Sequence, residues 1–279
     1  MNKNELGLAC WGMRELTLEK QIQLCKRLQV RLMEIDIANA PRGLPLNCGE
    51  QQIEATKRLF AESEMPLYFA ATGNDFTLPE EMEVQKQIEK VKKVTDLCGR
   101  LGIRYLRFFA GFSPVEQITS ARFEVLMRSI ESVCQYAQKR HVQMVMELHG
   151  GVCAQGAGVK HFHSVSTQWD TVKEILKGAP QSMLFLLDPA NLCAVGEDPC
   201  RYYQLLAGRI AYLHAKEFQK ISGGGLRPAA CGVGAFDWAH FFCEIQGFEG
   251  PVLIEYEEPQ DVEQGMERSL NFMKDLIEK

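Results

Sequence analysis

Residues 143–151 read QMVMELHGG, a short apolar run that ends in a carboxylate, a histidine and two glycines. A run of this kind is typical of a strand buried in a parallel sheet. Seven similar runs recur along the chain, at 6–11, 32–38, 67–71, 105–110, 183–187, 210–213 and 252–256. The sequence therefore predicts eight buried strands.

Longer amphipathic segments lie between these runs. Thr17 can cap a helix that carries Ile22, Cys25 and Leu28 at helical spacing. Further helical patterns cover 80–98, 123–138, 167–176, 198–206, 238–245 and 263–277.

Strict alternation of strand and helix indicates a parallel sheet. Eight units of about 35 residues match a closed (β/α)8 barrel. An open, doubly wound sheet would instead need a glycine-rich phosphate loop after the first strand, where residues 11–14 read WGMR. We expect an α/β fold, a single TIM barrel spanning residues 1–279.

Composition excludes several classes of protein. Of the 279 residues, 46% are hydrophobic and 24% charged, which fits a globular chain rather than a disordered or fibrous one. The net charge of -5 argues against nucleic-acid binding. No apolar run reaches the roughly 18 residues of a membrane helix. Ten scattered cysteines without a CxxC pair indicate reduced core residues and a cytoplasmic location.

Charged residues stand where the last four predicted strands end. They are Glu147, Asp188, His214 and Glu255. In a barrel the carboxyl ends of the strands meet at one mouth. Three converging carboxylates would repel one another unless a cation lay between them. Three oxygens and one nitrogen suit Mn²⁺, Mg²⁺, Co²⁺ or Zn²⁺, so we expect one divalent metal there.

The last half of the chain carries motifs of a known family. Residues 147–151 read ELHGG, 188–191 DPAN, 214–217 HAKE, 232–238 GVGAFDW and 250–255 GPVLIE. In these motifs the chain resembles the sugar phosphate isomerase/epimerase superfamily, the xylose isomerase-like TIM barrels. The resemblance implies that Glu147, Asp188, His214 and Glu255 hold one divalent metal. It also suggests a homodimer.

Several other residues are candidates for binding substrate. His149 and Lys216 share strand faces with Glu147 and His214, because strand side chains alternate. Asn191 can hydrogen-bond a hydroxyl group. Arg107 either binds an anionic group or forms a buried ion pair with Glu34. Arg227 follows a glycine-rich loop at 222–225 and could close over the site, and a second loop is expected around 156–163.

These residues favour an isomerase or epimerase of a small keto sugar or related polyhydroxy carbonyl compound. A proton leaves the carbon next to the carbonyl and a metal-stabilised enediolate forms, with Glu147 and Glu255 as proton acceptor and donor. A dehydratase or lyase acting on a keto-inositol or 3-keto sugar begins with the same step. Two less favoured classes are an abasic-site endonuclease, which would need more than six histidines, and a non-catalytic sugar-binding protein.

Overall fold

The eight apolar runs form a closed parallel barrel. The computed structural model describes residues 5–38 and 42–277. Its barrel strands are β1 (Leu6–Leu8), β2 (Leu32–Ile37), β4 (Phe69–Ala71), β5 (Tyr105–Phe109), β6 (Gln143–Glu147), β9 (Leu184–Leu187), β10 (Ile210–Ala215) and β13 (Val252–Ile254). They pair in the order β1-β13-β10-β9-β6-β5-β4-β2, and pairing of β1 with β2 closes the ring. The predicted (β/α)8 fold is confirmed.

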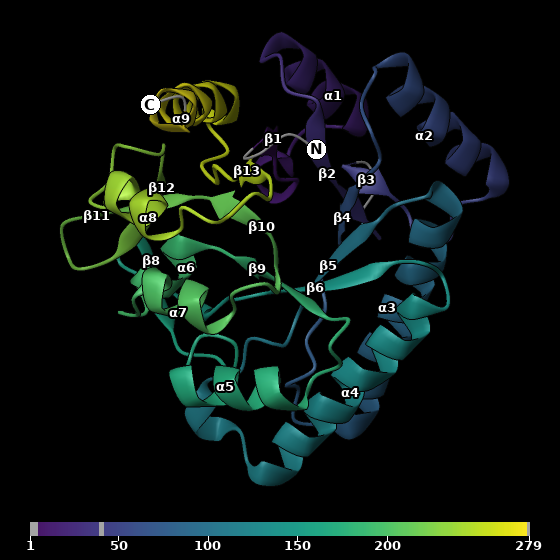
Figure 1. The fold of residues 1–279 in the computed structure, drawn as a ribbon, viewed down its shortest axis with the longest axis vertical. Helices are drawn as coiled ribbons and strands as arrows, with labels where there is room; N and C mark the ends of the chain where they lie inside the picture. The colour runs from purple at the N-terminus through teal and green to yellow at the C-terminus, as the bar shows by residue number, and fades with distance from the viewer. Residues whose placement is uncertain (1–4, 39–41, 278–279) are drawn as a thin grey trace.

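Helices surround the barrel on its outside (Figure 1). They are α1 (Leu18–Arg27), α2 (Glu50–Glu62), α3 (Glu81–Leu101), α4 (Ser120–Gln138), α5 (Trp169–Gly178), α6 (Pro189–Ala194), α7 (Pro199–Leu205), α8 (Trp238–Glu244) and α9 (Val262–Ile277). Thr17 caps α1 as expected, since its side chain accepts from the Lys20 amide. The sequence patterns did not locate α2 or α6. Within the described ranges, no helix has the length and apolar character to cross a bilayer.

One end of the barrel interior is filled by an apolar plug. The plug takes one residue from each strand, or from just beyond it: Ala9, Leu32, Phe69, Tyr105, Val145, Leu186, Tyr212 and Leu253. Phe69 packs against two aromatic rings, 5.4 Å from that of Tyr105 and 4.9 Å from that of Tyr212. Because strand side chains alternate, the next interior layer consists of the residues two positions later.

A second, antiparallel sheet belongs to segments that the sequence patterns left as loops. It contains β7 (Gly151–Gln155), β8 (Gly158–Phe162), β11 (Glu217–Lys220) and β12 (Leu226–Ala229), in the order β11-β12-β8-β7. The expectation of loops around 156–163 and after the seventh strand was therefore wrong in part. Glycines at 150, 151, 156 and 158 interrupt the strand pattern there. We call this sheet the cap sheet.

Gly7 allows β1 to lie close to both neighbouring strands. A Cβ atom at this position would lie 2.6 Å from Leu253 Cδ2, Leu32 Cβ and the Leu32 carbonyl oxygen. Overpacking against backbone cannot relax by a rotamer change, so we expect Gly7→Ala to lower the free energy of unfolding by about 3 kcal/mol. Urea unfolding measures this. Gly247→Ala is the control, because a Cβ atom there would have no neighbour within 4 Å. Equal stability of the Gly7→Ala and Gly247→Ala proteins would contradict the prediction.

Candidate active site

The interior layer above the plug is polar and almost entirely charged. Two positions beyond each of seven plug residues the strands carry Glu34, Ala71, Arg107, Glu147, Asp188, His214 and Glu255. All seven are buried. Burying this many charges is costly unless they are paired or bind an ion, so the layer is where a functional site is expected.

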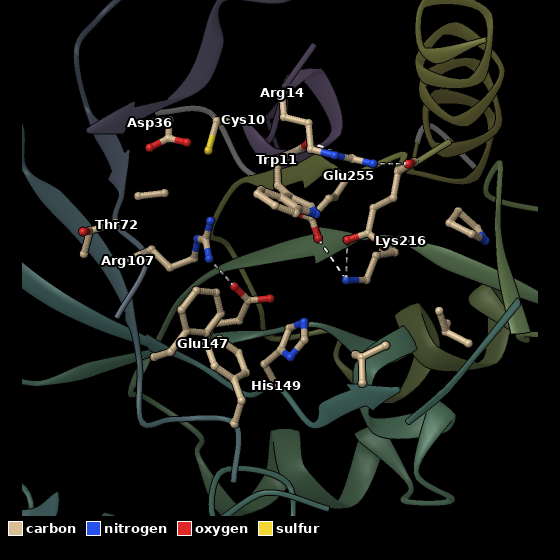
Figure 2. Close-up of a pocket in the computed structure, with 18 of the residues that line it drawn as sticks. Cys10, Trp11, Arg14, Asp36, Thr72, Arg107, Glu147, His149, Lys216 and Glu255 are labelled. Carbon is tan, nitrogen blue, oxygen red and sulfur yellow. Dashed lines mark hydrogen bonds and ion pairs between the residues drawn. The ribbon is translucent and has the colours of Figure 1, made fainter. Parts of the chain in front are cut away.

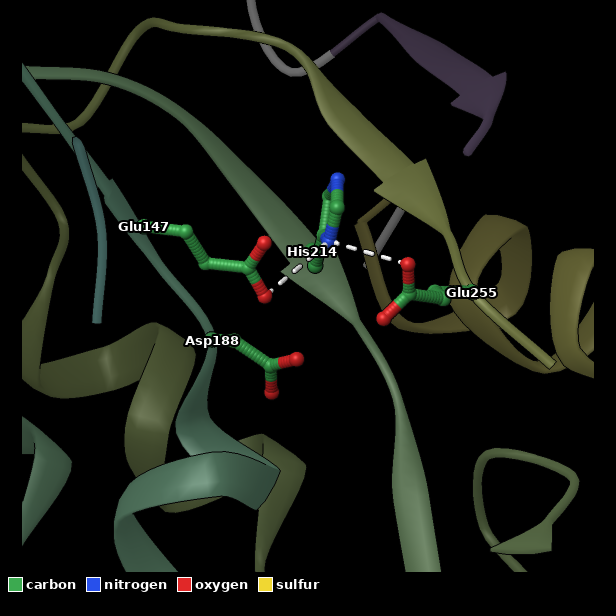
Figure 3. A group of neighbouring side chains, drawn as sticks. All are labelled: Glu147, Asp188, His214 and Glu255. Carbon is green, nitrogen blue, oxygen red and sulfur yellow. Dashed lines mark ion pairs between the residues drawn. The ribbon is translucent and has the colours of Figure 1, made fainter. Parts of the chain in front are cut away.

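The structure brings the four predicted metal ligands together (Figure 3). Glu147, Asp188, His214 and Glu255 each offer one atom, and these atoms lie within 4.8 Å of one another. His214 Nδ1 is 3.5 Å from Glu255 Oε1 and 4.0 Å from Glu147 Oε1. None of the four side chains is more than 3% exposed.

Asp188 uses one oxygen to cap a helix and directs the other toward the cluster and Lys216. It is the N-cap of α6, where Oδ1 accepts from the amides of Ala190 at 2.9 Å and Asn191 at 3.2 Å. Among the described residues, neither ring nitrogen of His214 has a hydrogen-bond partner, and Asp188 Oδ2 has only the ion pair with Lys216 Nζ at 3.2 Å. Unsatisfied buried polar atoms are rare in native proteins, so two unpartnered ring nitrogens facing buried carboxylates fit a site that binds an ion.

The electrostatics of the cluster also fit a cation. Burial and the neighbouring Glu255 raise the pKa of Glu147 and of Asp188. Burial opposes charge on His214, but Glu255, Glu34 and Glu147 nevertheless raise its pKa to about 9. Without a metal, a proton on His214 therefore neutralises part of the negative charge of the carboxylates. A bound metal would neutralise the same charge.

Lys216 lies against the same carboxylates. Its Nζ atom is 3.0 Å from Glu255 Oε2, 3.2 Å from Asp188 Oδ2 and 3.3 Å from Glu257 Oε1. Burial disfavours its charge, but Asp188, Glu257 and Glu255 outweigh burial and raise the pKa of Lys216. It therefore stays protonated. Burial and the Lys216 ammonium act in opposite directions on Glu255, and the net result is a pKa well below its usual range.

A cavity of about 600 Å³ opens directly above the cluster (Figure 2). Glu147, Glu255, Lys216, His149 and Arg107 all line it. Its walls are otherwise largely apolar, with Phe109, Phe112 and Trp11 among them. Charged groups at the base and apolar walls around them are the usual composition of a small-molecule site.

His149 is a neutral hydrogen-bond acceptor in this cavity. Its Nδ1 atom lies 2.5 Å from the Gly150 carbonyl oxygen, so Nδ1 carries the proton and Nε2 has the free lone pair. Burial, helped by Lys216, lowers the pKa of His149 to about 4. Its ring packs edge-on against those of Phe109 and Phe112, 5.5 Å from each.

The remaining predicted residues occupy three different environments. Arg107 forms the buried ion pair with Glu34 and also pairs with Glu147. Because it lines the cavity as well, binding of an anionic group by Arg107 remains a prediction. Asn191 is buried behind Glu147, to which its Nδ2 donates at 3.1 Å. Arg227 is exposed on β12 and lines a separate hollow beside Asp261.

Glu217 explains a motif that the sequence alone left without a role. Its buried carboxylate accepts from the Gly232 amide at 2.5 Å, the Phe236 amide at 3.2 Å and Trp238 Nε1 at 3.1 Å. The GVGAFDW segment is thus tied to the strand end that carries His214 and Lys216.

Sequence reasoning named Glu34 of β2 only as an ion-pair partner of Arg107, which is confirmed, and it missed Asp36 and the cap sheet. Glu34 and Asp36 alternate within the apolar β2, a signal that both side chains face the interior. The cap sheet supplies Val152, Val159 and His161 to the cavity wall. No sequence pattern predicted these three residues, because the strands that carry them were not identified from the sequence.

His161 provides a test of the cavity electrostatics. Burial lowers the pKa of His161 to about 3, against 6.5 for an ordinary histidine. The unfolded chain binds a proton below pH 6.5 that the folded protein does not, so this contribution to stability is complete above pH 6.5 and is lost as the pH falls toward 3.

We expect His161→Phe to reduce the acid sensitivity of folding. Below about pH 5.5 the slope of unfolding free energy against pH should fall by about 1.4 kcal/mol per pH unit relative to the unaltered protein. Urea titrations between pH 7.5 and 4.5 measure it. Parallel losses of stability in the two proteins would show that folded His161 takes up a proton normally.

Comparison with known proteins supports the barrel fold. A family model described as xylose isomerase-like TIM barrel matches residues 22–276. No curated protein sequence matches the chain. A probable 3-DHS dehydratase AsbF from Bacillus anthracis has a TM-score of 0.78 at 14% identity, covering 97% of this chain and 98% of that one.

Two further solved structures share the fold. The IolI protein with a binding zinc atom has a TM-score of 0.76 at 17% identity, with 98% of each chain covered. D-allulose 3-epimerase from Methylomonas sp. has a TM-score of 0.75 at 15% identity, covering 99% of this chain and 98% of that one. The family model spans nearly the whole barrel, and the chain therefore belongs to the xylose isomerase-like TIM barrel family.

Proposed function

We propose that this protein is a divalent-metal-dependent isomerase or epimerase of a small keto sugar or related polyhydroxy carbonyl compound. The observation that carries the proposal is the buried cluster of Glu147, Asp188, His214 and Glu255 at the floor of the cavity. Structural neighbours that are sugar epimerases support it. The unpaired cysteines, six of them buried, favour a reducing, cytoplasmic location.

The residues of the site fit a divalent cation. Five carboxylates, those of Glu34, Glu147, Asp188, Glu255 and Glu257, face only two permanent cations within the described chain, Arg107 and Lys216. Glu147, Asp188, His214 and Glu255 would hold the ion. When bound, Mn²⁺, Mg²⁺, Co²⁺ or Zn²⁺ supplies Lewis-acid polarisation of the substrate carbonyl.

In this proposal Glu147 and Glu255 move the proton. They enter the cavity from β6 and from the end of β13, on opposite sides of His214 (Figure 3). The pKa of Glu147 is raised and that of Glu255 is lowered, so the two carboxyl groups differ in proton affinity. Carboxyl groups whose pKa values are pushed apart suit opposite roles as acid and base.

Lys216 and His149 would orient the substrate. The Lys216 ammonium can donate to an oxygen on which negative charge develops, while His149 Nε2 can accept from a hydroxyl group. Phe109 and Phe112 form an apolar wall behind His149. This wall would exclude water from the carbon that loses its proton.

A dehydratase or lyase is the second candidate, because the Lys216 ammonium inside the cavity can hydrogen-bond a departing hydroxyl group and stabilise the charge that develops on it. Elimination needs such a donor at the departing hydroxyl group, which an isomerase does not. A neighbour of the same fold is a probable dehydratase.

Deuterium exchange tests the proposal and separates the two reactions. The metal-free protein is incubated in D₂O with a panel of ketohexoses, 3-keto sugars and inososes, with and without added Mn²⁺. Metal-dependent deuterium next to the carbonyl of recovered or epimerised sugar supports the isomerase. A product that has lost water relative to the substrate, seen by mass spectrometry, supports the lyase. If neither exchange nor water loss occurs with any compound when Mn²⁺, Mg²⁺, Co²⁺ or Zn²⁺ is added in turn, both reactions are rejected.

A further inference from the structure

Glu34 is a buried carboxylate behind the cluster for which the proposed reaction has no use. It lies in the middle of β2 and its side chain is 0% exposed. Tyr212 Oη donates to Oε1 at 2.9 Å, Arg107 Nε donates to Oε1 at 3.2 Å, and Cys10 Sγ donates to Oε2 at 3.1 Å. A buried charge is tolerated only when it is paired and hydrogen-bonded, so three side chains committed to holding Glu34 in place require an explanation.

Arg107 connects Glu34 to the cluster. Its Nε atom donates to Glu34, and its Nη1 atom donates to Glu147 Oε2 at 2.7 Å. The guanidinium group is planar, so fixing one edge on Glu34 also fixes the direction of the other. Arg107 thus cannot turn away from Glu147 without losing Glu34.

This bridge determines which oxygen of Glu147 faces the cluster. Oε2 is taken by Arg107, whereas Oε1 accepts from Asn191 Nδ2 at 3.1 Å and lies 4.0 Å from His214 Nδ1. Only Oε1 is therefore presented to an ion shared with His214. The carboxylate would offer one oxygen rather than two.

Glu34 also lies behind the His214 ring. Nδ1 of His214 faces Glu255 at 3.5 Å, and Nε2 on the other side is 3.9 Å from Glu34 Oε1. A histidine that binds a metal commonly directs its second nitrogen toward a carboxylate, which fixes the ring and its tautomer. Glu34 is the carboxylate in that position.

We propose that Glu34 is the positioning residue of the metal site. Through Arg107 it aims Glu147 Oε1, and through its charge behind the ring it keeps His214 Nδ1 toward the ion. Glu34 itself touches neither metal nor substrate. The inference rests on the proposed function, because it assumes that the cluster binds a divalent cation.

Metal affinity without substrate tests the inference. Mn²⁺ is titrated calorimetrically into metal-free protein, with circular dichroism melting as a check on folding. We expect Glu34→Gln and Glu34→Asp each to weaken Mn²⁺ binding by about 10–100-fold. Asp keeps the negative charge but is one methylene shorter, so it cannot hold Arg107 and face His214 from the same place.

Tyr212→Phe is the matched control, because it removes one hydrogen bond to Glu34 and leaves the Arg107 bridge intact. Its affinity for Mn²⁺ should fall by no more than about threefold. If Glu34→Asp binds Mn²⁺ as the unaltered protein does, position is irrelevant and the inference is overturned, even if Glu34→Gln does not fold. Should the unaltered protein bind none of Mn²⁺, Mg²⁺, Co²⁺ and Zn²⁺, the proposed function fails first and this inference with it.

Discussion

Replacing Glu147 by glutamine is expected to lower the rate of deuterium exchange next to the substrate carbonyl by about 10²–10⁴-fold. Glu147 lines the cavity and is one of the two carboxylates proposed to move the proton. An amide keeps the shape of the side chain but neither accepts nor releases a proton at neutral pH. Exchange by NMR, with the protein saturated in Mn²⁺, measures the effect.

Two measurements separate proton transfer from a general loss of the site. The Mn²⁺ content of Glu147→Gln shows whether the cluster still binds an ion, since Oε1 could be replaced by the amide oxygen. Glu267→Gln, an exposed substitution on α9, is the control for the chemical change itself. If the metal-loaded Glu147→Gln protein exchanges deuterium within about tenfold of the unaltered protein, Glu147 is not the proton carrier.

The barrel and the four-residue cluster follow from the sequence because both depend on short-range regularities. Apolar runs of strand length predict the strands, and the last residues of four runs predict what lies at the mouth. Alternation then places His149 above Glu147 and Lys216 above His214, and all but His214 line the cavity. The same rule applied to β2 would have included Glu34 and Asp36.

The cap sheet could not be predicted in the same way. Its hairpin β7–β8 has an irregular pattern with three glycines at its ends and turn, and it pairs with β12, far away in sequence. Such pairing is set by tertiary contacts and not by local propensity. Arg227 was expected over the site because it follows a glycine-rich loop, yet on β12 it faces another hollow. The alternation of side chains along a strand shows which layer of the barrel a residue belongs to only when the strand itself has been identified.

Removing Lys216 is expected to make folding depend on metal. Lys216→Met would leave Asp188, Glu255 and Glu257 without the buried ammonium that lies within 3.3 Å of each. Breaking a buried ion pair by deleting one partner typically costs about 3–5 kcal/mol. For a chain of this size, the midpoint of thermal unfolding of the metal-free protein should fall by about 5–10 °C.

Added Mn²⁺ should reverse most of this loss, because the ion would replace the missing positive charge on the same carboxylates. The carboxylates are also released from competition with Lys216, so Mn²⁺ should raise the unfolding midpoint of Lys216→Met more than that of the unaltered protein. Lys220→Met, four residues later and exposed on β11, should change neither the midpoint nor the response to metal. Equal metal-induced shifts in Lys216→Met and the unaltered protein would mean that Lys216 and the ion do not share these carboxylates. Because the comparison uses folding rather than turnover, it holds whichever sugar is the substrate.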